Sequence, residues 1–279
     1  MNFTAVITGA STGIGEATAR RVAREPGAEL LLVARRGELL ERLAGQLPCP
    51  AHSLPLDLTS PEAPARVRDA VERHFGGRLN LLVNNAGAAW RGTFSDTGWA
   101  NVERHMRLNF EAPVRLIEAL LPVLRSTAAS SDGAGTGYAA PVSIVNVAST
   151  AGRVSRPNSG AYSASKFALA GWSDALHGEE APHGVHVGLV LPGFIKTEGF
   201  PAAELTAKAT TRWLVSEPEA VAEAIWEAGP GGRAERYVPR PYFIPAVLRV
   251  LLPRLVRRST AGGAFTTATK TGSGGATSL

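Results

Sequence analysis

Tyr162 and Lys166 stand four residues apart in the stretch Tyr-Ser-Ala-Ser-Lys, and Ser149 lies upstream of them. Because residues i and i+4 share one face of a helix, the two side chains are expected to lie together. A phenol has a pKa of about 10, which makes it a poor acid at neutral pH. A neighbouring ammonium stabilises the phenolate, so we expect Lys166 to lower the pKa of Tyr162 and allow proton exchange. Such a pair alone is common on helix surfaces, and its meaning depends on the motifs around it.

A glycine-rich motif, Gly-Ala-Ser-Thr-Gly-Ile-Gly, directly follows the first apolar run of the chain. Gly9 would permit a tight turn, Gly13 would let the backbone approach a pyrophosphate, and Gly15 would let a helix pack closely on a strand. The free N–H groups at the start of that helix would face anionic phosphates, and the hydroxyls of Ser11 and Thr12 would add donors. Its place after the first strand favours dinucleotide binding over a plain glycine-rich turn.

The residues after the second apolar run bear on which dinucleotide binds. An acidic residue there would accept hydrogen bonds from a ribose 2′-hydroxyl, but this chain has Arg35 and Arg36. Guanidinium groups suit a 2′-phosphate by charge and by their forked geometry. We therefore predict a preference for NADP(H) over NAD(H), with Arg35 as the main contact and Arg36 as the second. The alternative is a solvated arginine pair at the start of a helix.

Two further strand ends supply candidate contacts for the adenosine half of the cofactor. Asp57 could accept from the adenine amino group while the Leu58 amide donates to the ring. In the sequence Asn-Asn-Ala-Gly at 84–87, small residues would let the chain run against the adenosine ribose, and the asparagine amides would tie adjacent strand ends together. Asn84 could equally have a purely structural role. The predicted contacts here are Asn85, Ala86 and Gly87.

Apolar runs alternate with helical patterns along the chain, which predicts an α/β fold. The runs are nearly all apolar, as expected for strands covered on both faces. We expect a single Rossmann-like, doubly wound parallel sheet of about seven strands with helices on both faces. The predicted strands cover 4–7, 29–33, 51–56, 79–83, 142–147, 185–190 and 236–238. The predicted helices cover 15–24, 37–46, 61–75, 98–124, 161–180 and 217–227.

Bulk properties limit the classes of function. The 279 residues, 44% of them hydrophobic, suffice for one large α/β domain, predicted at 1–240. A net charge of +5 without a basic, aromatic-rich stripe argues against nucleic-acid binding. The single cysteine, Cys49, excludes an internal disulfide and fits a reducing compartment. With no visible secretory signal and no apolar run long enough to span a membrane, we expect a cytoplasmic protein.

Three segments of unusual composition fall outside this pattern. Residues 126–140 are rich in Ser, Ala and Gly, which predicts a mobile surface loop. Residues 261–279 are rich in Gly, Thr and Ala, which predicts a disordered tail. Between them, residues 241–258, within a C-terminal segment at 241–260, are apolar, basic and interrupted by prolines. We interpret them first as a short helix that closes the substrate cleft or packs on another subunit. Peripheral contact with a membrane surface is the alternative.

With these motifs in place, the chain closely resembles the short-chain dehydrogenase/reductase family. The resemblance spans residues 3 to about 197 and departs from the common pattern at Ala148 and Thr12. The second departure leaves the NADP(H) prediction resting on the arginine pair. The motifs that carry the resemblance are Thr8-Gly9-Ala10-Ser11-Thr12-Gly13-Ile14-Gly15, Asn84-Asn85-Ala86-Gly87, Asn109, Ser149, Tyr162-Ser163-Ala164-Ser165-Lys166 and Pro192-Gly193.

The resemblance implies a role for each catalytic residue. Tyr162 is the general acid in carbonyl reduction and the base in alcohol oxidation. Lys166 holds the nicotinamide ribose and lowers the pKa of Tyr162. Ser149 donates to the substrate oxygen, and Asn109 holds a water that links Lys166 to solvent, although a mid-helix Asn bonded to backbone is the alternative. Residues 192–197 anchor the nicotinamide carboxamide. The cofactor contacts expected from the glycine-rich turn and from this anchor are Gly9, Ser11, Thr12, Gly13, Ile14, Gly15, Pro192, Gly193, Ile195 and Thr197.

The sequence therefore predicts an NADP(H)-dependent oxidoreductase that acts on a carbonyl or secondary alcohol, with no metal. The alternatives are a membrane-surface reductase of lipid or steroid carbonyls and a catalytically idle dinucleotide sensor. The resemblance also implies a homodimer or homotetramer built through the helices at 98–124 and 161–180. His183 and His186 lack a third ligand, which favours a structural role. Aromatic residues expected in the loops beside the ligand, as pocket or core, are Trp90, Phe94, Phe194, Phe200 and Trp213.

Overall fold

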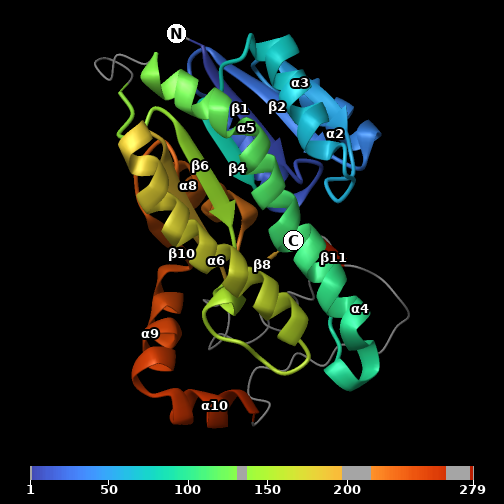
Figure 1. The fold of residues 1–279 in the computed structure, drawn as a ribbon, viewed down its shortest axis with the longest axis vertical. Coiled ribbons are helices and arrows are strands. Elements are labelled where there is room, and N and C mark those ends of the chain that lie inside the picture. The colour runs from blue at the N-terminus through green and yellow to red at the C-terminus, as the bar shows by residue number, and fades with distance from the viewer. Residues whose placement is uncertain (1, 131–136, 197–214, 262–276, 279) are drawn as a thin grey trace.

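The structure is a computed structural model that describes residues 2–130, 137–196, 215–261 and 277–278. Seven strands form its central sheet, and every pair of neighbours is parallel. They match the seven predicted runs to within two residues at each end. The strands are β1 (Phe3–Thr8), β2 (Ala28–Ala34), β3 (Ala51–Pro55), β4 (Leu81–Asn84), β6 (Ser143–Val147), β7 (His186–Pro192) and β10 (Glu235–Val238). Their order across the sheet is β10-β7-β6-β4-β1-β2-β3, which confirms the doubly wound fold (Figure 1).

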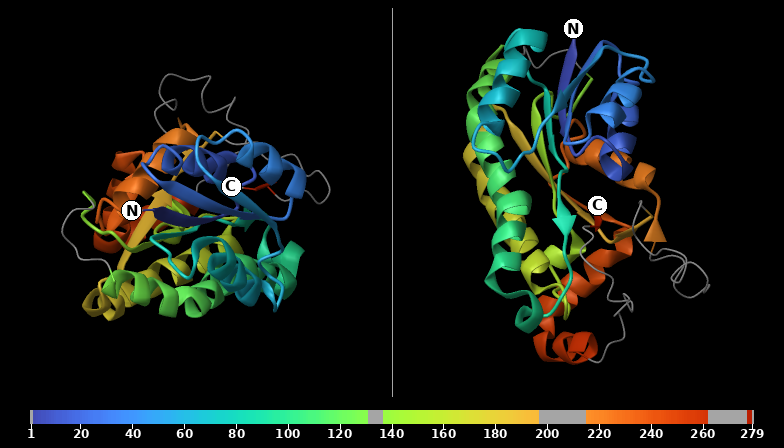
Figure 2. Two further views of the ribbon diagram at one scale, coloured as in Figure 1. Left: turned by 90° about the horizontal axis from the view of Figure 1, so that it is seen from above. Right: turned by 90° about the vertical axis from the view of Figure 1, so that its right-hand side faces the viewer.

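Helices cover both faces of the sheet (Figure 2). The core on one face holds residues from α1, α2 and α8, and the core on the other holds residues from α3, α5 and α6. All residues of β1 are buried for this reason, and four of its six residues are apolar, with a threonine at its second and last positions. The helices are α1 (Gly13–Val22), α2 (Gly37–Ala44), α3 (Ala63–Phe75), α4 (Phe94–Met106), α5 (Ala112–Ala129), α6 (Gly160–Glu180), α8 (Pro218–Ala228), α9 (Phe243–Leu251) and α10 (Pro253–Ala261).

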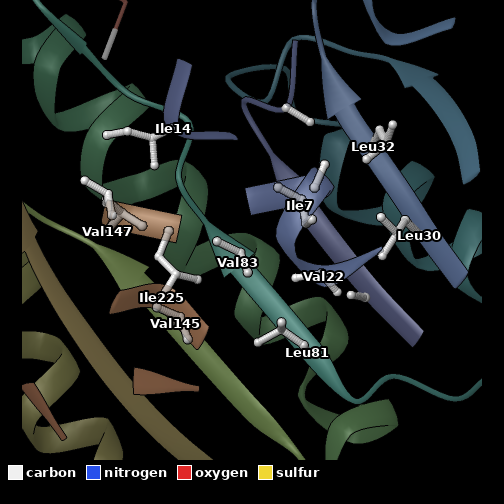
Figure 3. Packing of buried hydrophobic residues seen from close by; sticks show 14 of the residues in the cluster. Ile7, Ile14, Val22, Leu30, Leu32, Leu81, Val83, Val145, Val147 and Ile225 are labelled. Carbon is white, nitrogen blue, oxygen red and sulfur yellow. The ribbon is translucent and has the colours of Figure 1, made fainter. Parts of the chain in front are cut away.

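The first of these cores lies directly beneath the predicted cofactor site. Figure 3 shows strand residues such as Leu81 and Val145 gathered with Val22 of α1 and Ile225 of α8. Each fully buried aliphatic side chain of this kind stabilises the fold by about 1.5–3 kcal/mol. Ile14 also belongs to this core, so the helix that follows the glycine-rich turn is fixed against the sheet.

Shorter elements occur in the connections. The residues 107–111 form a π-helix between α4 and α5, and the other short helices are of the 3-10 type. These elements are β5 (Ala88–Ala89), η1 (Arg107–Glu111), η2 (Thr150–Gly152), η3 (Ala181–His183), β8 (Phe194–Ile195), β9 (Val215–Ser216), η5 (Arg240–Tyr242) and β11 (Thr277–Ser278).

The helix predicted at 98–124 extends beyond this range at both ends, although the backbone at Gly98 is not helical (φ 57°, ψ −162°) and a kink there divides the first turn from the rest. It starts at Phe94, where the Thr93 hydroxyl accepts a 3.2 Å hydrogen bond from the Asp96 amide as an N-cap. It ends at Ala129, so the loop predicted at 126–140 begins too early. The polar Thr127 is buried in the helix because its hydroxyl accepts a 3.0 Å hydrogen bond from the Leu79 amide. The Ser, Thr and Ala composition of residues 126–129 therefore predicted a loop, although these residues form the last turn of α5.

The C-terminal helices α9 and α10 lie at the end of the molecule toward which the strands' carboxyl ends point (Figure 1). No helix among the described residues is long and apolar enough to cross a membrane. Most of the tail predicted at 261–279 lies outside the described residues. Within it, β11 pairs antiparallel with β5.

Candidate active site

The glycine-rich turn has the shape that its sequence predicts. Gly9 and Gly13 have φ values of 66° and 59°, in the left-handed region that favours glycine. A Cβ atom at Gly15 would lie 2.1 Å from the Gly9 carbonyl oxygen, so only glycine allows α1 to start this close to β1. The Gly9 amide donates a 2.8 Å hydrogen bond to Val33, which fixes the turn against β2. The turn therefore presents the start of α1 at the carboxyl edge of the sheet.

A cleft of about 520 Å³ lies beside this turn. Its walls come from the turn and from the ends of β2, β3 and β4, which meet because parallel strands end at one edge. Predicted cofactor contacts that the structure brings together around this cleft are Gly9, Ser11, Thr12, Arg35, Arg36, Asp57, Leu58, Ala86 and Gly87. The cleft fits the adenosine half of a dinucleotide in both position and lining.

Arg36 is the arginine that contacts the glycine-rich turn. Its Nη2 atom donates to the hydroxyl of Thr12 at 2.8 Å and to that of Ser11 at 3.1 Å. Arg35 instead faces Asp57. Burial acts to raise the pKa of Asp57, but hydrogen bonds from Thr59 and the Arg35 charge outweigh it and lower the pKa. Both guanidinium groups border the cleft, and Arg36 is the one tied to the turn.

A second, smaller cavity adjoins the turn on the side of β6 and β7. It brings together three of the four predicted catalytic residues and several predicted cofactor contacts from five separate segments of the chain, whereas Asn109 does not line it. Those that line it are Ile14, Asn85, Ser149, Tyr162, Lys166, Pro192, Gly193 and Ile195. Thr197, Phe200 and Trp213 lie outside the described residues.

Lys166 and Tyr162 lie on one face of α6 and are buried, with exposed fractions of 2% and 7%. Lys166 Nζ donates a 2.8 Å hydrogen bond to the Val147 carbonyl. Burial lowers the pKa of this lysine to about 8. The lysine is therefore held at the end of β6 by a backbone acceptor, with its charge disfavoured by its surroundings.

The expected lowering of the Tyr162 pKa by Lys166 is wrong for this structure. Burial raises the pKa of Tyr162 to about 12, while Ser149, Arg156 and Arg91 act to lower it. No described residue pairs with Tyr162 Oη in ordinary hydrogen-bond geometry. The prediction considered only the charge of Lys166 on the same helix. The cost of removing a phenolate from water is larger and sets the direction of the pKa shift.

Ser149 and Asn109 are fixed by the backbone around them. Ser149 Oγ caps η2, accepting from the Ala151 amide at 3.1 Å and donating to the Pro192 carbonyl at 3.3 Å. Asn109 lies on the π-helix η1, where its amide makes 3.0 Å hydrogen bonds to both backbone groups of Ala88. It also donates to Ser165 at 3.0 Å. Asn109 is thus a helical asparagine bonded to backbone, as the alternative interpretation expected. The backbone groups that it contacts belong to Ala88 of β5.

Gly87 links the two cavities. A Cβ atom there would lie 3.1 Å from Asn109 Oδ1 and 3.3 Å from Lys166 Nζ. The strand end after β4 therefore lies close to both side chains, and any larger residue at this position would press on both. Asn85 is fixed nearby, because its side-chain amide donates to the Thr8 carbonyl at 3.0 Å.

The structure adds residues that the sequence argument missed. His105 is fully buried, accepts from the Trp90 amide at 3.0 Å and stacks edge-on 6.1 Å from the Tyr162 ring. Tyr242 of η5 lies over Gly193, where a Cβ would meet its ring at 2.5 Å. The Thr93 cap was a visible signal for the start of α4, but nothing in the sequence places His105 or Tyr242 near Tyr162.

The loop aromatics differ in their positions. Trp90 lines the larger cleft, and Phe194 is buried beside the smaller cavity. Phe94 is 71% exposed at the start of α4, so its placement in a pocket is wrong for the described part of the chain. Phe94 is the first residue of α4, which the prediction of a loop at this position did not anticipate.

The histidines do not form a metal centre within the described residues. His186 contacts the carbonyl oxygens of Ala228 at 2.9 Å and Arg233 at 3.3 Å, and its ring lies edge-on to His177. No group of three or more potential metal ligands occurs in the part of the chain that the structure describes. His186 thus has the structural role that its sequence context favours.

Comparison with known proteins agrees with this geometry. Residues 3–207 match the family described as short chain dehydrogenase. The chain is 33% identical over 208 residues to dehydrogenase/reductase SDR family member 7B of Bos taurus, covering 70% of this chain and 59% of that protein. It is 34% identical over 227 residues to fatty acyl-CoA reductase Rv0547c of Mycobacterium tuberculosis, covering 76% and 71%.

A solved structure gives the same result. The chain superposes on a short-chain dehydrogenase from Streptomyces avermitilis with a TM-score of 0.74 and 28% identity, covering 95% of this chain and 99% of that one. The match to the bovine protein and its Xenopus relatives spans about three fifths of their length.

Proposed function

The chain belongs to the short-chain dehydrogenase family of nicotinamide-dependent oxidoreductases, and we propose that it reduces a carbonyl compound with NADP(H) as the preferred cofactor. The observation that carries this proposal is the convergence of Ser149, Tyr162 and Lys166 on one cavity beside the glycine-rich turn. The substrate is a ketone, an aldehyde or, in the reverse direction, a secondary alcohol. The apolar lining from Val147, Pro192 and Ile195 favours a moderately apolar body.

The chemistry divides between the cofactor and the protein. When bound, the dinucleotide supplies a hydride to the carbonyl carbon. Tyr162 Oη donates its proton to the carbonyl oxygen as the C=O double bond becomes a C–OH single bond. The Ser149 hydroxyl donates a hydrogen bond to the same oxygen and stabilises the charge that develops there. Alcohol oxidation reverses each transfer, with Tyr162 as the base.

Lys166 and Asn109 act behind the tyrosine in this proposal. Lys166 would hold the nicotinamide ribose from its position at the end of β6. Asn109 would hold a water beside Lys166 and so connect the lysine to solvent, since Gly87 lies close to both side chains. Because burial raises the pKa of Tyr162 to about 12, proton transfer near neutral pH would rely on Ser149, Arg156 and Arg91, which act to lower that pKa.

The cofactor preference rests on the arginine pair. Arg36 is tied to the phosphate-binding turn through Ser11 and Thr12, and Arg35 borders the same cleft. Two guanidinium groups at this position would bind a 2′-phosphate and leave a bare 2′-hydroxyl with weaker partners. The predicted adenosine contacts Asp57 and Leu58 line the same cleft.

A panel of carbonyls and alcohols tests the proposal, with cofactor absorbance followed for both NADP(H) and NAD(H). The expected result is faster oxidation of NADPH than of NADH with at least one apolar carbonyl. Binding of NADPH without turnover over a broad panel would instead favour a catalytically idle sensor. Turnover with NADH alone would contradict the cofactor preference.

A second candidate is reduction of lipid or steroid carbonyls at a membrane surface. The helices α9 and α10 expose large apolar side chains, among them Val250 at 79%, Leu251 at 68% and Leu255 at 60%. Four arginines lie between 249 and 258 on the same two helices, and the described part of these helices has no acidic residue. Such a cationic, apolar surface suits the interface of an anionic bilayer.

Liposome flotation separates the two candidates. The full-length double variant Val250→Gln, Leu251→Gln should lose binding to vesicles that contain anionic lipid. Phe94→Gln, which removes an equally exposed apolar side chain on α4, serves as the control. If the wild type, the double variant and the Phe94→Gln control float equally, Val250 and Leu251 make no membrane contact and the second candidate is refuted. The oligomer proposed through α4, α5 and α6 is tested separately by light scattering, which should give two or four copies.

A further inference from the structure

We propose that Arg156, together with Arg91, binds an anionic group of the substrate, a carboxylate or a phosphate, beside the hydroxyl of Tyr162. This inference deepens the proposed carbonyl reduction and rests on it for the position of the reacting carbonyl. It assigns a second recognition element to the site, one that the apolar lining of the smaller cavity does not supply.

The two arginines come from segments far apart in sequence. Arg91 follows β5, and Arg156 lies in the segment between η2 and α6. A 3.0 Å hydrogen bond from the Gly92 amide to the Asn158 carbonyl joins these segments. Asn158 has a φ value of 62°, in the left-handed region, so the backbone at this junction is a tight turn. The junction therefore brings the segment that carries Arg91 next to the segment that carries Arg156.

The Arg156 side chain lies over the wall of the active site. Its Cζ atom is 4.8 Å from the centre of the Phe194 ring. Phe194 directly follows Gly193, which lines the same cavity as Ser149 and Tyr162. Tyr242 completes this wall, with its ring 6.4 Å from that of Phe194. The Phe194 ring attracts the guanidinium group without neutralising its charge.

Arg156 differs from the other partly buried arginines in its partners. Arg21, Arg125, Arg153 and Arg236 each form an ion pair with a glutamate. No carboxylate of the described residues forms an ion pair with Arg156, and the titratable groups that act on it are Arg91 and two tyrosines, Tyr162 and Tyr242. Burial and Arg91 lower the pKa of Arg156, which shows that the protein destabilises its charge. A buried cation without a counter-charge is costly unless a ligand supplies one.

The charge of the residues around the smaller cavity also favours an anionic ligand. The residues that line the smaller cavity include Lys166 and no acid. Arg91 and Arg156 also act on the Tyr162 hydroxyl, so both lie within electrostatic reach of the reacting carbonyl. An anion held between the arginines would orient the substrate with its carbonyl toward Tyr162. A guanidinium pair suits the oxygens of both a carboxylate and a phosphate.

Matched substrates test the proposal. One arm compares a keto acid with its methyl ester, and a second compares a phosphorylated ketone with the free hydroxyketone, so the two arms distinguish a carboxylate from a phosphate. In at least one arm the wild-type kcat/KM should favour the anion by about ten- to hundredfold, the range of one or two charged hydrogen bonds. Arg156→Met should reduce this preference to about twofold, mostly through KM, and Arg156→Lys should retain part of it.

Arg68→Met is the matched control, because Arg68 is a half-exposed arginine on α3, far along the chain from the site. It should leave the preference unchanged. A second measurement needs no turnover: the melting temperature with succinate, inorganic phosphate or dimethyl succinate. At least one of the two anions should raise it for the wild type and not for Arg156→Met, and the diester should raise neither.

The outcomes distinguish the two proposals. If neutral carbonyls are reduced as fast as their anionic partners in both arms, the anion site is refuted and the carbonyl reductase stands. If Arg156→Met keeps the preference, the site is likewise refuted. If no carbonyl of any kind is reduced, the proposed function fails, and the melting measurement decides the anion site by itself.

Discussion

Lys166 Nζ donates a 2.8 Å hydrogen bond to the carbonyl oxygen of Val147 at the carboxyl end of β6. The bond ties the central residue of α6 to the strand that also delivers Ser149. It satisfies one donor of an ammonium group that is 98% removed from solvent, since the residue is 2% exposed. The position of the lysine is therefore built into the fold of the chain, before any cofactor contact is considered.

The titration of Lys166 gives the first prediction. Its pKa is about 8 in the folded protein against 10.5 for an unperturbed lysine. Between these values the unfolded chain binds more protons than the folded one, so stability rises as the pH increases from about 8 to about 10.5. Lys166→Met should remove this rise and also lower turnover. Melting temperatures across this pH range check it, and an unchanged slope in the variant would contradict the assignment.

Arg36 gives the second prediction. Arg36→Glu should reverse the cofactor preference and change the NADPH-to-NADH ratio of kcat/KM by about tenfold or more, because a carboxylate repels a 2′-phosphate and accepts from a 2′-hydroxyl. Arg35→Glu should act in the same direction. Arg42→Glu, an equal change of charge on α2 that does not line the cleft, is the control. If the NADPH-to-NADH ratio changed equally in Arg36→Glu, Arg35→Glu and Arg42→Glu, the change would reflect the net charge of the protein and contradict the assignment to the arginine pair.

Asn109 gives the third prediction. Asn109→Ala removes three hydrogen bonds and leaves the amide and carbonyl of Ala88 without their side-chain partner. Loss of partners for buried backbone groups costs about 1–3 kcal/mol each, so the loss of two should destabilise the variant by about 2–6 kcal/mol. Denaturant unfolding measures this difference. A loss below about 0.5 kcal/mol would mean that solvent or another group replaces the amide.

His105 gives the fourth prediction. Burial, the largest cause, lowers its pKa, and contributions from Arg104 and Lys166 add to this against the hydrogen bond to Asn101. The unfolded chain therefore binds a proton near pH 6.5 that the folded chain resists, and stability falls as the pH drops below that value. His105→Gln should flatten this slope between about pH 6.5 and 5. Because the pKa values of His74 and His186 are lowered too, part of the slope should remain.

Much of this arrangement could be predicted from the sequence because it depends on local patterns. Seven apolar runs became seven strands, and the order of the motifs placed the glycine-rich turn, Ser149 and the Tyr162–Lys166 pair at one edge of the sheet. The helix predicted at 217–227 is α8, which Pro218 opens at a first-turn position that suits proline. These features follow from periodicity and from the geometry of parallel strands.

Other features depend on tertiary contacts that no short pattern reveals. The π-helix that carries Asn109 has no sequence signature, and polar Thr127 continues α5 because it bonds to Leu79 from another segment. Likewise Arg156 reaches Phe194 only through the folding of two loops. The pKa of Tyr162 was misjudged for a related reason, since burial is a property of the whole fold.

The most direct test of the central claim is the turnover of Tyr162→Phe. The account predicts that NADPH oxidation with an accepted carbonyl falls by about 10²–10⁴-fold, the usual contribution of a general acid. Stability should be unchanged or slightly increased, because the lost hydroxyl is buried without a described partner. NADPH binding should persist. A variant that reduces the same carbonyl at the wild-type rate would contradict the account, because some other group would then supply the proton.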